Sequence, residues 1–222
     1  MLLWMMSSPS YVIGGNDAAA FPLVAIRNRA LIVLQVVPFV AMTAIILATI
    51  LRGVAIKRRT GDRPLAFLSA KGVQRIAGLV FALSSLAMLV ASARSAMHGS
   101  KDFTEIAALI STLGAVIVII AQIQMGRAWR IGVREGDAPL FISHGLFRFS
   151  RNPIFIGMML TGLGINLAAA NWWAWMALGL FCIACAVQVR IEESHLEASF
   201  GQDYRDFCVM VPRWIGCGPM TA

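Results

Sequence analysis

Long apolar stretches, separated by shorter segments rich in basic residues, dominate the pattern of the chain. A helix that crosses the hydrocarbon core of a bilayer needs about 20 mostly apolar residues, and interfacial flanks can extend a shorter stretch. Five stretches meet or approach this length: residues 30–51, 76–93, 106–121, 153–170 and 172–189. The pattern therefore predicts an all-α integral membrane protein with about five transmembrane helices.

The last two predicted spans follow each other almost without a linker. Only Ala170 and Asn171 separate them, so we expect a tight helical hairpin. Trp172, Trp173 and Trp175 stand at its tip. Tryptophan is enriched where a helix meets the membrane–water interface, which is typical of an aromatic belt.

Composition agrees with this pattern, because 59% of the residues are hydrophobic and only 14% are charged. Soluble domains carry about 25% charged residues, and a soluble core of this size cannot bury so much apolar surface. Residues 1–6 are apolar but too short, and lack the basic flank, for a cleaved signal peptide. Four cysteines are too few for a secreted disulfide framework. We expect a multi-pass protein of a bacterial-type inner membrane.

The net charge of +8 is explained by topology rather than by a nucleic-acid partner. Lys and Arg near span ends stay in the cytoplasm, and here they concentrate after the first, third and fifth spans. On the other side of the membrane the basic residues are Arg27, Arg29, Arg94 and Lys101. The amino terminus is therefore expected outside and the carboxyl terminus in the cytoplasm, with the basic residues facing membrane lipids.

Two cytoplasmic segments are longer than simple turns and have helical patterns of their own. After the third span, Arg127, Arg130 and Arg134 recur at helical spacing. After the fifth span, an apolar stripe of period three to four runs along the tail, formed by Leu196, Phe200, Tyr204, Phe207 and Val211. The simplest interpretation is two interfacial helices in the headgroup layer. The chain divides into a three-span region, 1–121, and a core with the loop, hairpin and tail, 122–222.

Three local features suggest more than anchoring. A loop over residues 143–153 ends at Pro153, which suits the first turn of a helix, where the following N–H groups can receive an anionic or polar group. Glu192 and Glu193 are paired acids at a membrane edge, which either lie among headgroups or bind a cation. Three glycines of the fourth span, at positions 157, 162 and 164, allow close approach of either a neighbouring helix or a flat ligand.

Metal and hydrolase chemistry have no support in the sequence. Cys182 and Cys185 lie inside the fifth predicted span and are interpreted as small buried hydrophobic residues. The three histidines, at positions 98, 144 and 195, are too scattered for a zinc site, so no metal is expected. A nucleophile motif of the G-x-S-x-G type does not occur either.

The loop and the tail together resemble one family. Residues 145–157, G-L-F-R-F-S-R-N-P-I-F-I-G, resemble the G-x-Y-R-x-x-R-H-P-x-Y-x-G loop of the isoprenylcysteine carboxyl methyltransferase family. Residues 192–196, 200–204 and 211–213 resemble its E-E-x-x-L, F-G-x-x-Y and V-P-R tail. Membrane phospholipid N-methyltransferases share this superfamily. The match covers roughly residues 122–214.

The resemblance implies an integral-membrane methyltransferase that uses S-adenosylmethionine in a cytosol-facing pocket. By this analogy Glu192 holds the cofactor's ammonium group, and Glu193 either supports it or faces water. The remaining cofactor-binding residues implied by the resemblance are Leu140, Phe141, Ile142, Phe147, Asn152, Pro153, Ile154 and Phe155. Methyl transfer from a sulfonium needs alignment and exclusion of water but no protein nucleophile, and we assign no catalytic residue.

Departures from the family pattern bear mainly on the acceptor. Asn152 stands where the family has His, and Phe147 and Phe155 stand where it has Tyr. Gln188 stands where prenylcysteine enzymes have an arginine, and Gln cannot replace the charge of a guanidinium. The expected substrate-binding residues are Gln188, Arg148 and Arg151, the two arginines having headgroup contact as an equal alternative.

The sequence thus predicts methyl transfer from S-adenosylmethionine to a lipophilic acceptor at the cytosolic membrane face. The acceptor could be a prenylcysteine carboxylate, a lipid headgroup, a thiol or an amine. Two alternatives remain open. A membrane reductase of similar architecture would use a nicotinamide cofactor, and a non-catalytic membrane protein that keeps the scaffold would bind neither cofactor.

Overall fold

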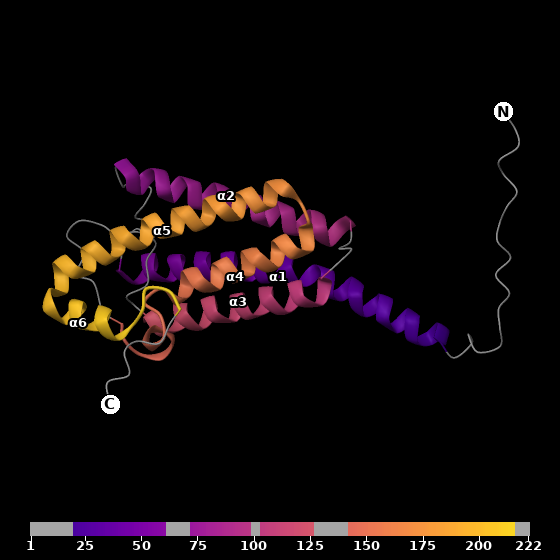
Figure 1. The fold of residues 1–222 in the computed structure, drawn as a ribbon, viewed down its shortest axis with the longest axis horizontal. Helices are drawn as coiled ribbons and strands as arrows, with labels where there is room; N and C mark the ends of the chain where they lie inside the picture. Colours follow the sequence, from indigo (N-terminus) through magenta and orange to yellow (C-terminus); the bar gives the residue numbers. More distant parts are fainter. Residues whose placement is uncertain (1–19, 61–71, 99–102, 127–141, 216–222) are drawn as a thin grey trace, which may run out of the picture.

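A computed structural model describes residues 20–60, 72–98, 103–126 and 142–215. Within these ranges the chain is helical and forms no strand. The elements in chain order are α1 (Ala20–Thr60), α2 (Gly72–His98), α3 (Thr104–Met125), the short 3-10 helix η3 (Gly145–Arg148), α4 (Pro153–Ala169), α5 (Trp172–Phe200) and α6 (Gln202–Met210). Helices α1 to α5 run side by side as a bundle, and α6 lies at one end of it (Figure 1).

The predicted all-α membrane architecture is confirmed, although the count of five spans is not. Four helices, α1, α2, α3 and α5, are long and apolar enough to cross a membrane. Helix α4 begins at the predicted Pro153 and ends at Ala169, one residue before the predicted end, and its 17 residues reach only about 26 Å at 1.5 Å per residue. A typical hydrocarbon core is about 30 Å thick, so a full crossing by α4 stays a prediction.

The outer surface of the bundle agrees with a lipid surround. Large apolar side chains are exposed on every long helix, among them Val33, Leu83, Leu109 and Ile183. In water such a surface would be strongly unfavourable, whereas in lipid it meets a solvent of its own polarity. The expected hairpin is also present, since Ala170 and Asn171 alone connect α4 to α5.

Helix α5 is longer than its predicted span and carries the tail of the chain. Its 29 residues extend about 43 Å, so its last turns project past a hydrocarbon core of about 30 Å. Gly201 then breaks the helix with a φ of 54°, a conformation that glycine adopts without steric cost. Beyond it, α6 packs back on the end of α5.

The apolar stripe predicted for the tail is confirmed as a small separate core. Tyr204, Phe207 and Val211 are buried and pack with Leu196 and Phe200. The stripe is shared by two helices rather than one, because Gly201 interrupts it. This cluster fixes the direction in which the chain continues after α6.

Several sequence expectations lie outside the described residues. These are the first residues, 1–6, the basic stretch with Arg127, Arg130 and Arg134, and the two predicted cofactor residues Leu140 and Phe141.

Helix α4 packs most extensively against α3, through residues with little or no side chain. A methyl group on Gly114 of α3 would collide with the carbonyl oxygen of Gly157, and one on Gly164 would collide with Ser111. Gly162 faces Leu178 and Met88 instead. The glycines of the fourth span therefore serve close helix packing, which was one of their two interpretations. In lipid such packing substitutes for a hydrophobic driving force.

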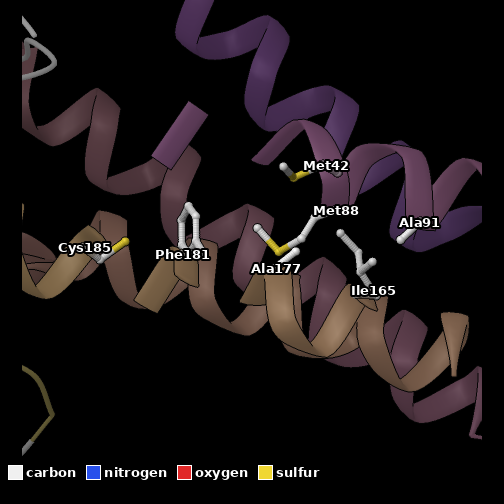
Figure 2. Close-up of a cluster of buried hydrophobic side chains, with 8 residues drawn as sticks. Met42, Met88, Ala91, Ile165, Ala177, Phe181 and Cys185 are labelled. Atoms are coloured by element: carbon white, nitrogen blue, oxygen red, sulfur yellow. The ribbon is translucent and has the colours of Figure 1, made fainter. Parts of the chain in front are cut away.

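The largest buried cluster joins four helices on the other side of α4. Met42 of α1, Met88 of α2, Ile165 of α4 and Phe181 of α5 are almost fully buried there. Figure 2 shows Met88 and Ile165 converging above α5, with Cys185 one turn beyond Phe181. Cys185 is thus a core residue, as its position in the span suggested.

Because the α3–α4 contact leaves no room for a side chain, we predict that Gly114→Ala lowers the free energy of unfolding by about 1–3 kcal/mol. Thermal unfolding of the purified protein in detergent measures this. The matched control is Gly179→Ala, since a methyl group at Gly179 meets nothing within 4 Å. Equal melting temperatures for the two variants would contradict close packing at Gly114.

Candidate functional site

The loop between α3 and α4 is held in place by Gln124 near the end of α3. The Gln124 side-chain oxygen accepts a hydrogen bond of 2.8 Å from the Leu146 backbone N–H. Gly145, at a φ of 63°, lies directly against this side chain, and a methyl group there would collide with it. Phe147 follows in η3 and is buried. The loop is therefore docked on α3 rather than extended into solvent.

The start of α4 lacks a side-chain cap. Asn152 occupies the N-cap position but makes no capping hydrogen bond. Its side-chain nitrogen instead donates to the Arg213 carbonyl oxygen at 3.0 Å. Pro153 follows in the first turn and has no N–H, whereas Ile154 and Phe155 carry N–H groups that no preceding turn can accept. This end of α4 therefore carries a partial positive charge and backbone N–H groups that have no acceptor within the helix.

The side chains of the same turn enter the bundle. Ile154 packs against a buried cluster that includes Ile45 and Val118. Phe155 packs against the main cluster, and its ring meets Phe81 edge-on at a centroid distance of 6.4 Å. The first turn of α4 thus offers polar backbone at its end and apolar side chains along its flanks.

One face of α5 changes from apolar to polar as it approaches this end of the bundle. Phe181, Cys185, Gln188 and Glu192 follow at spacings of four, three and four residues, which places them along one side of a helix. Phe181, Cys185 and Gln188 are buried, and Glu192 is half-buried. The Gln188 side-chain nitrogen donates to one Glu192 oxygen at 3.0 Å.

The Glu192 carboxylate has a neutral partner instead of a cation. In the described ranges, the Lys and Arg side chains that form ion pairs do so with Glu193 and Glu197, not with Glu192. A carboxylate withdrawn from water is costly unless a positive charge compensates it. Glu192 is therefore a site that a cationic group would stabilise.

Glu193, the next residue, is in the opposite situation and joins three segments of the chain. One carboxylate oxygen pairs with the Arg151 guanidinium of the loop at 3.4 Å. The other accepts a hydrogen bond of 2.8 Å from Arg213 Nε and lies 2.6 Å from Arg213 Nη2. We call Arg151, Glu193 and Arg213 the arginine clamp. Hydrogen bonding to the Glu193 carboxylate raises the pKa of Arg213 above its ordinary value.

Backbone contacts reinforce the arginine clamp. The Arg151 N–H donates to the Pro212 carbonyl oxygen at 3.0 Å, and the Ser150 hydroxyl donates to the Arg213 carbonyl oxygen at 3.3 Å. Arg151 also contacts the Cys208 sulfur of α6. The loop residues 150–152 and the tail residues 211–213 therefore run alongside each other, next to the end of α5 (Figure 1).

Some of the predicted site residues contact one another or share a partner in the structure. Asn152 and Glu193 come together through Arg213, and Gln188 lies against Glu192. Ile142 is half-buried and Arg148 is exposed. Arg151, expected at the substrate, is engaged with Glu193 in this structure. The roles of all these residues in binding remain predictions.

Three contributors were not among the predicted site residues. Arg213 stands in the V-P-R motif, which was used for the resemblance only. Gln124 is a polar residue at the end of an apolar span, which is a weak signal. Cys208 has no sequence signal, because its contact with Arg151 depends on how α6 folds back.

A comparison with protein-family models gives one match, to the phospholipid methyltransferase family, over residues 103–203. This segment contains α3, the docked loop, the helical hairpin and both glutamates. No curated protein and no solved structure matches the chain. The family match confirms the predicted resemblance, and residues 103–203 are similar to membrane methyltransferases of the phospholipid methyltransferase family.

Proposed function

We propose that the protein transfers a methyl group from S-adenosylmethionine to a lipophilic acceptor at one face of the membrane. The observation that carries this proposal is the half-buried Glu192, whose recorded partner is the neutral Gln188 amide. It lies within the segment that matches a membrane methyltransferase family. A carboxylate in this situation is suited to an ammonium ligand, with which it would make a charge-assisted hydrogen bond.

The amino-acid part of the cofactor has an ammonium and a carboxylate, and the protein has a partner for each. Glu192 supplies the negative partner for an ammonium. The uncapped start of α4, with the N–H groups of Ile154 and Phe155, supplies donors for a carboxylate. When bound, S-adenosylmethionine supplies an electrophilic methyl group on a sulfonium. Gln188 would hold the Glu192 carboxylate in position, which limits reorganisation when the ligand binds.

The apolar neighbours support a lipophilic acceptor. Phe81, Phe155 and Phe181 form a contiguous aromatic group next to the polar end of the α5 face, with Phe81 and Phe181 ring centroids 4.9 Å apart. Such a group excludes water from the side that faces the bundle interior, as methyl transfer requires. Transfer itself then depends on alignment of acceptor and methyl group rather than on a protein nucleophile.

Among the acceptor classes, a lipid headgroup has the best support. The family model that matches is that of phospholipid methyltransferases. A prenylcysteine carboxylate would need a cation at position 188, but Gln188 is neutral and its amide already donates to Glu192. Arg148, which is exposed beside the site, remains the proposed contact for an anionic headgroup.

We predict that Glu192→Gln weakens binding of S-adenosylmethionine and of S-adenosylhomocysteine about 10- to 100-fold, the range expected when a hydrogen bond to a charged group is lost. Calorimetric titration of the detergent-solubilised protein measures this. The matched control is Glu197→Gln on the same helix, because the Glu197 side chain is 52% exposed. Unchanged affinity in Glu192→Gln, or stabilisation by a nicotinamide cofactor instead, would count against the proposal.

We also predict that membranes incubated with methyl-labelled S-adenosylmethionine and the protein accumulate label in the phospholipid fraction. Glu192→Gln should lower the incorporation at least about tenfold at limiting cofactor, following its loss of affinity. Mild base distinguishes the acceptors, because it releases methanol from a carboxyl methyl ester and leaves N-methyl and S-methyl groups intact. Base-labile label would exclude the headgroup amine as acceptor.

A further inference from the structure

Both oxygens of the Glu193 carboxylate already have arginine partners within the protein. Arg151 faces one oxygen and Arg213 the other. The side chains of Glu193 and Arg151 are each only 12% exposed, whereas that of Arg213 is 42% exposed. Ion pairs at exposed positions contribute little, but removing one partner of an ion pair withdrawn from water leaves an uncompensated charge and is costly. The charge of Glu193 is therefore neutralised without any ligand.

Glu192 and Glu193 are adjacent and identical in type, but their side chains have different partners. Adjacent residues of a helix point about 100° apart, and here Glu192 meets Gln188 while Glu193 meets the loop and the tail. A cationic ligand gains more from Glu192, since Glu193 would have to give up an arginine first. Direct ligation of the cofactor by both glutamates is thus not what the contacts favour.

The arginine clamp acts on the segment that positions the start of α4. Arg151 immediately precedes Asn152, the N-cap residue, and Asn152 itself donates to the Arg213 carbonyl oxygen. Arg213 is thus bound to Glu193 through its side chain and to Asn152 through its backbone. Release of Glu193 would loosen both ends of this connection at once.

We propose that Glu193 is a positioning residue, which acts through Arg151 and Arg213 to hold residues 150–152 and the first turn of α4 next to Glu192. The inference rests on the proposed function, because it assigns the cofactor's ammonium group to Glu192. In this scheme Glu193 does not touch the cofactor. It keeps the N–H donors of α4 in place, so that the carboxylate and ammonium ends of one ligand are met together.

The first experiment needs no ligand. Hydrogen–deuterium exchange of the ligand-free protein reports on the Arg151 N–H, whose acceptor is the Pro212 carbonyl oxygen. Glu193→Gln and Arg213→Gln should each accelerate exchange in peptides that contain Arg151, by about tenfold, while exchange in α3 stays unchanged. Glu197→Gln is the control, since its partner Arg205 lies on the exposed side of α6. Unaltered exchange in both clamp variants would overturn the inference.

The second experiment measures affinity for S-adenosylhomocysteine. Glu193→Gln should weaken binding about tenfold, and the double variant Glu193→Gln/Arg213→Gln should bind no more weakly than Glu193→Gln alone, because both changes break the same connection. Glu193→Asp, which keeps the charge, should restore part of the affinity. Direct contact with the cofactor predicts the opposite pattern, with independent losses from Glu193→Gln and Arg213→Gln, and this result would overturn the inference.

The outcomes separate the inference from the proposed function. Wild-type protein that binds neither S-adenosylmethionine nor S-adenosylhomocysteine would overturn both. Wild-type protein that binds S-adenosylhomocysteine, with Glu193→Gln of equal affinity, would overturn the inference alone. Faster exchange at Arg151 together with non-additive losses of affinity would support it.

Discussion

The close approach of α3 and α4 is the constraint on which the rest of the bundle depends. Gly114 and Gly157 bring the two backbones so near that a single added methyl group collides with the opposite helix. In lipid there is no hydrophobic driving force that brings apolar helices together. Shape complementarity of this kind therefore determines which helix faces pack against each other. Helix α4 is thereby fixed along its length, and its first turn is carried to the place where the loop, α5 and the tail meet.

Several polar side chains lie where the loop, the end of α5 and the tail meet. Gln124 anchors the loop, Gln188 restrains Glu192, and Glu193 holds the two arginines. The two glutamates illustrate how adjacent and chemically identical side chains can have different partners. The Glu193 carboxylate is paired with two arginines, whereas among the described residues the Glu192 carboxylate has the neutral Gln188 amide as its partner.

Much of the architecture could be predicted from the sequence because hydrophobic stretches in a membrane have a length fixed by the bilayer. The hairpin at Ala170 and Asn171 and the apolar stripe of the tail followed from spacing alone. The full crossing by α4 could not be decided, since its length lies at the lower limit. The break at Gly201 was also missed, because glycine inside a helical pattern is compatible with continuation as well as with a turn.

The site was harder to predict than the fold, for a physical reason. Motif spacing identified Asn152, Glu192 and Glu193, but the partners of Asn152 and Glu193 lie 20 or more residues away along the chain. The pairing of Arg213 with Glu193 depends on α6 folding back, which periodicity does not specify. Resemblance to a family locates candidate site residues well, but it does not predict which residues their side chains contact.

The return of the tail to the loop has a consequence for the order in which the protein can assemble. Residues 211–213 are synthesised after all the helices of the bundle, yet the loop that they hold precedes α4. The helices can therefore insert and pack during translation, whereas residues 150–152 of the loop can contact residues 211–213 only afterwards. The bundle would first exist as a membrane protein with an open end, and the last residues of the described chain would close it.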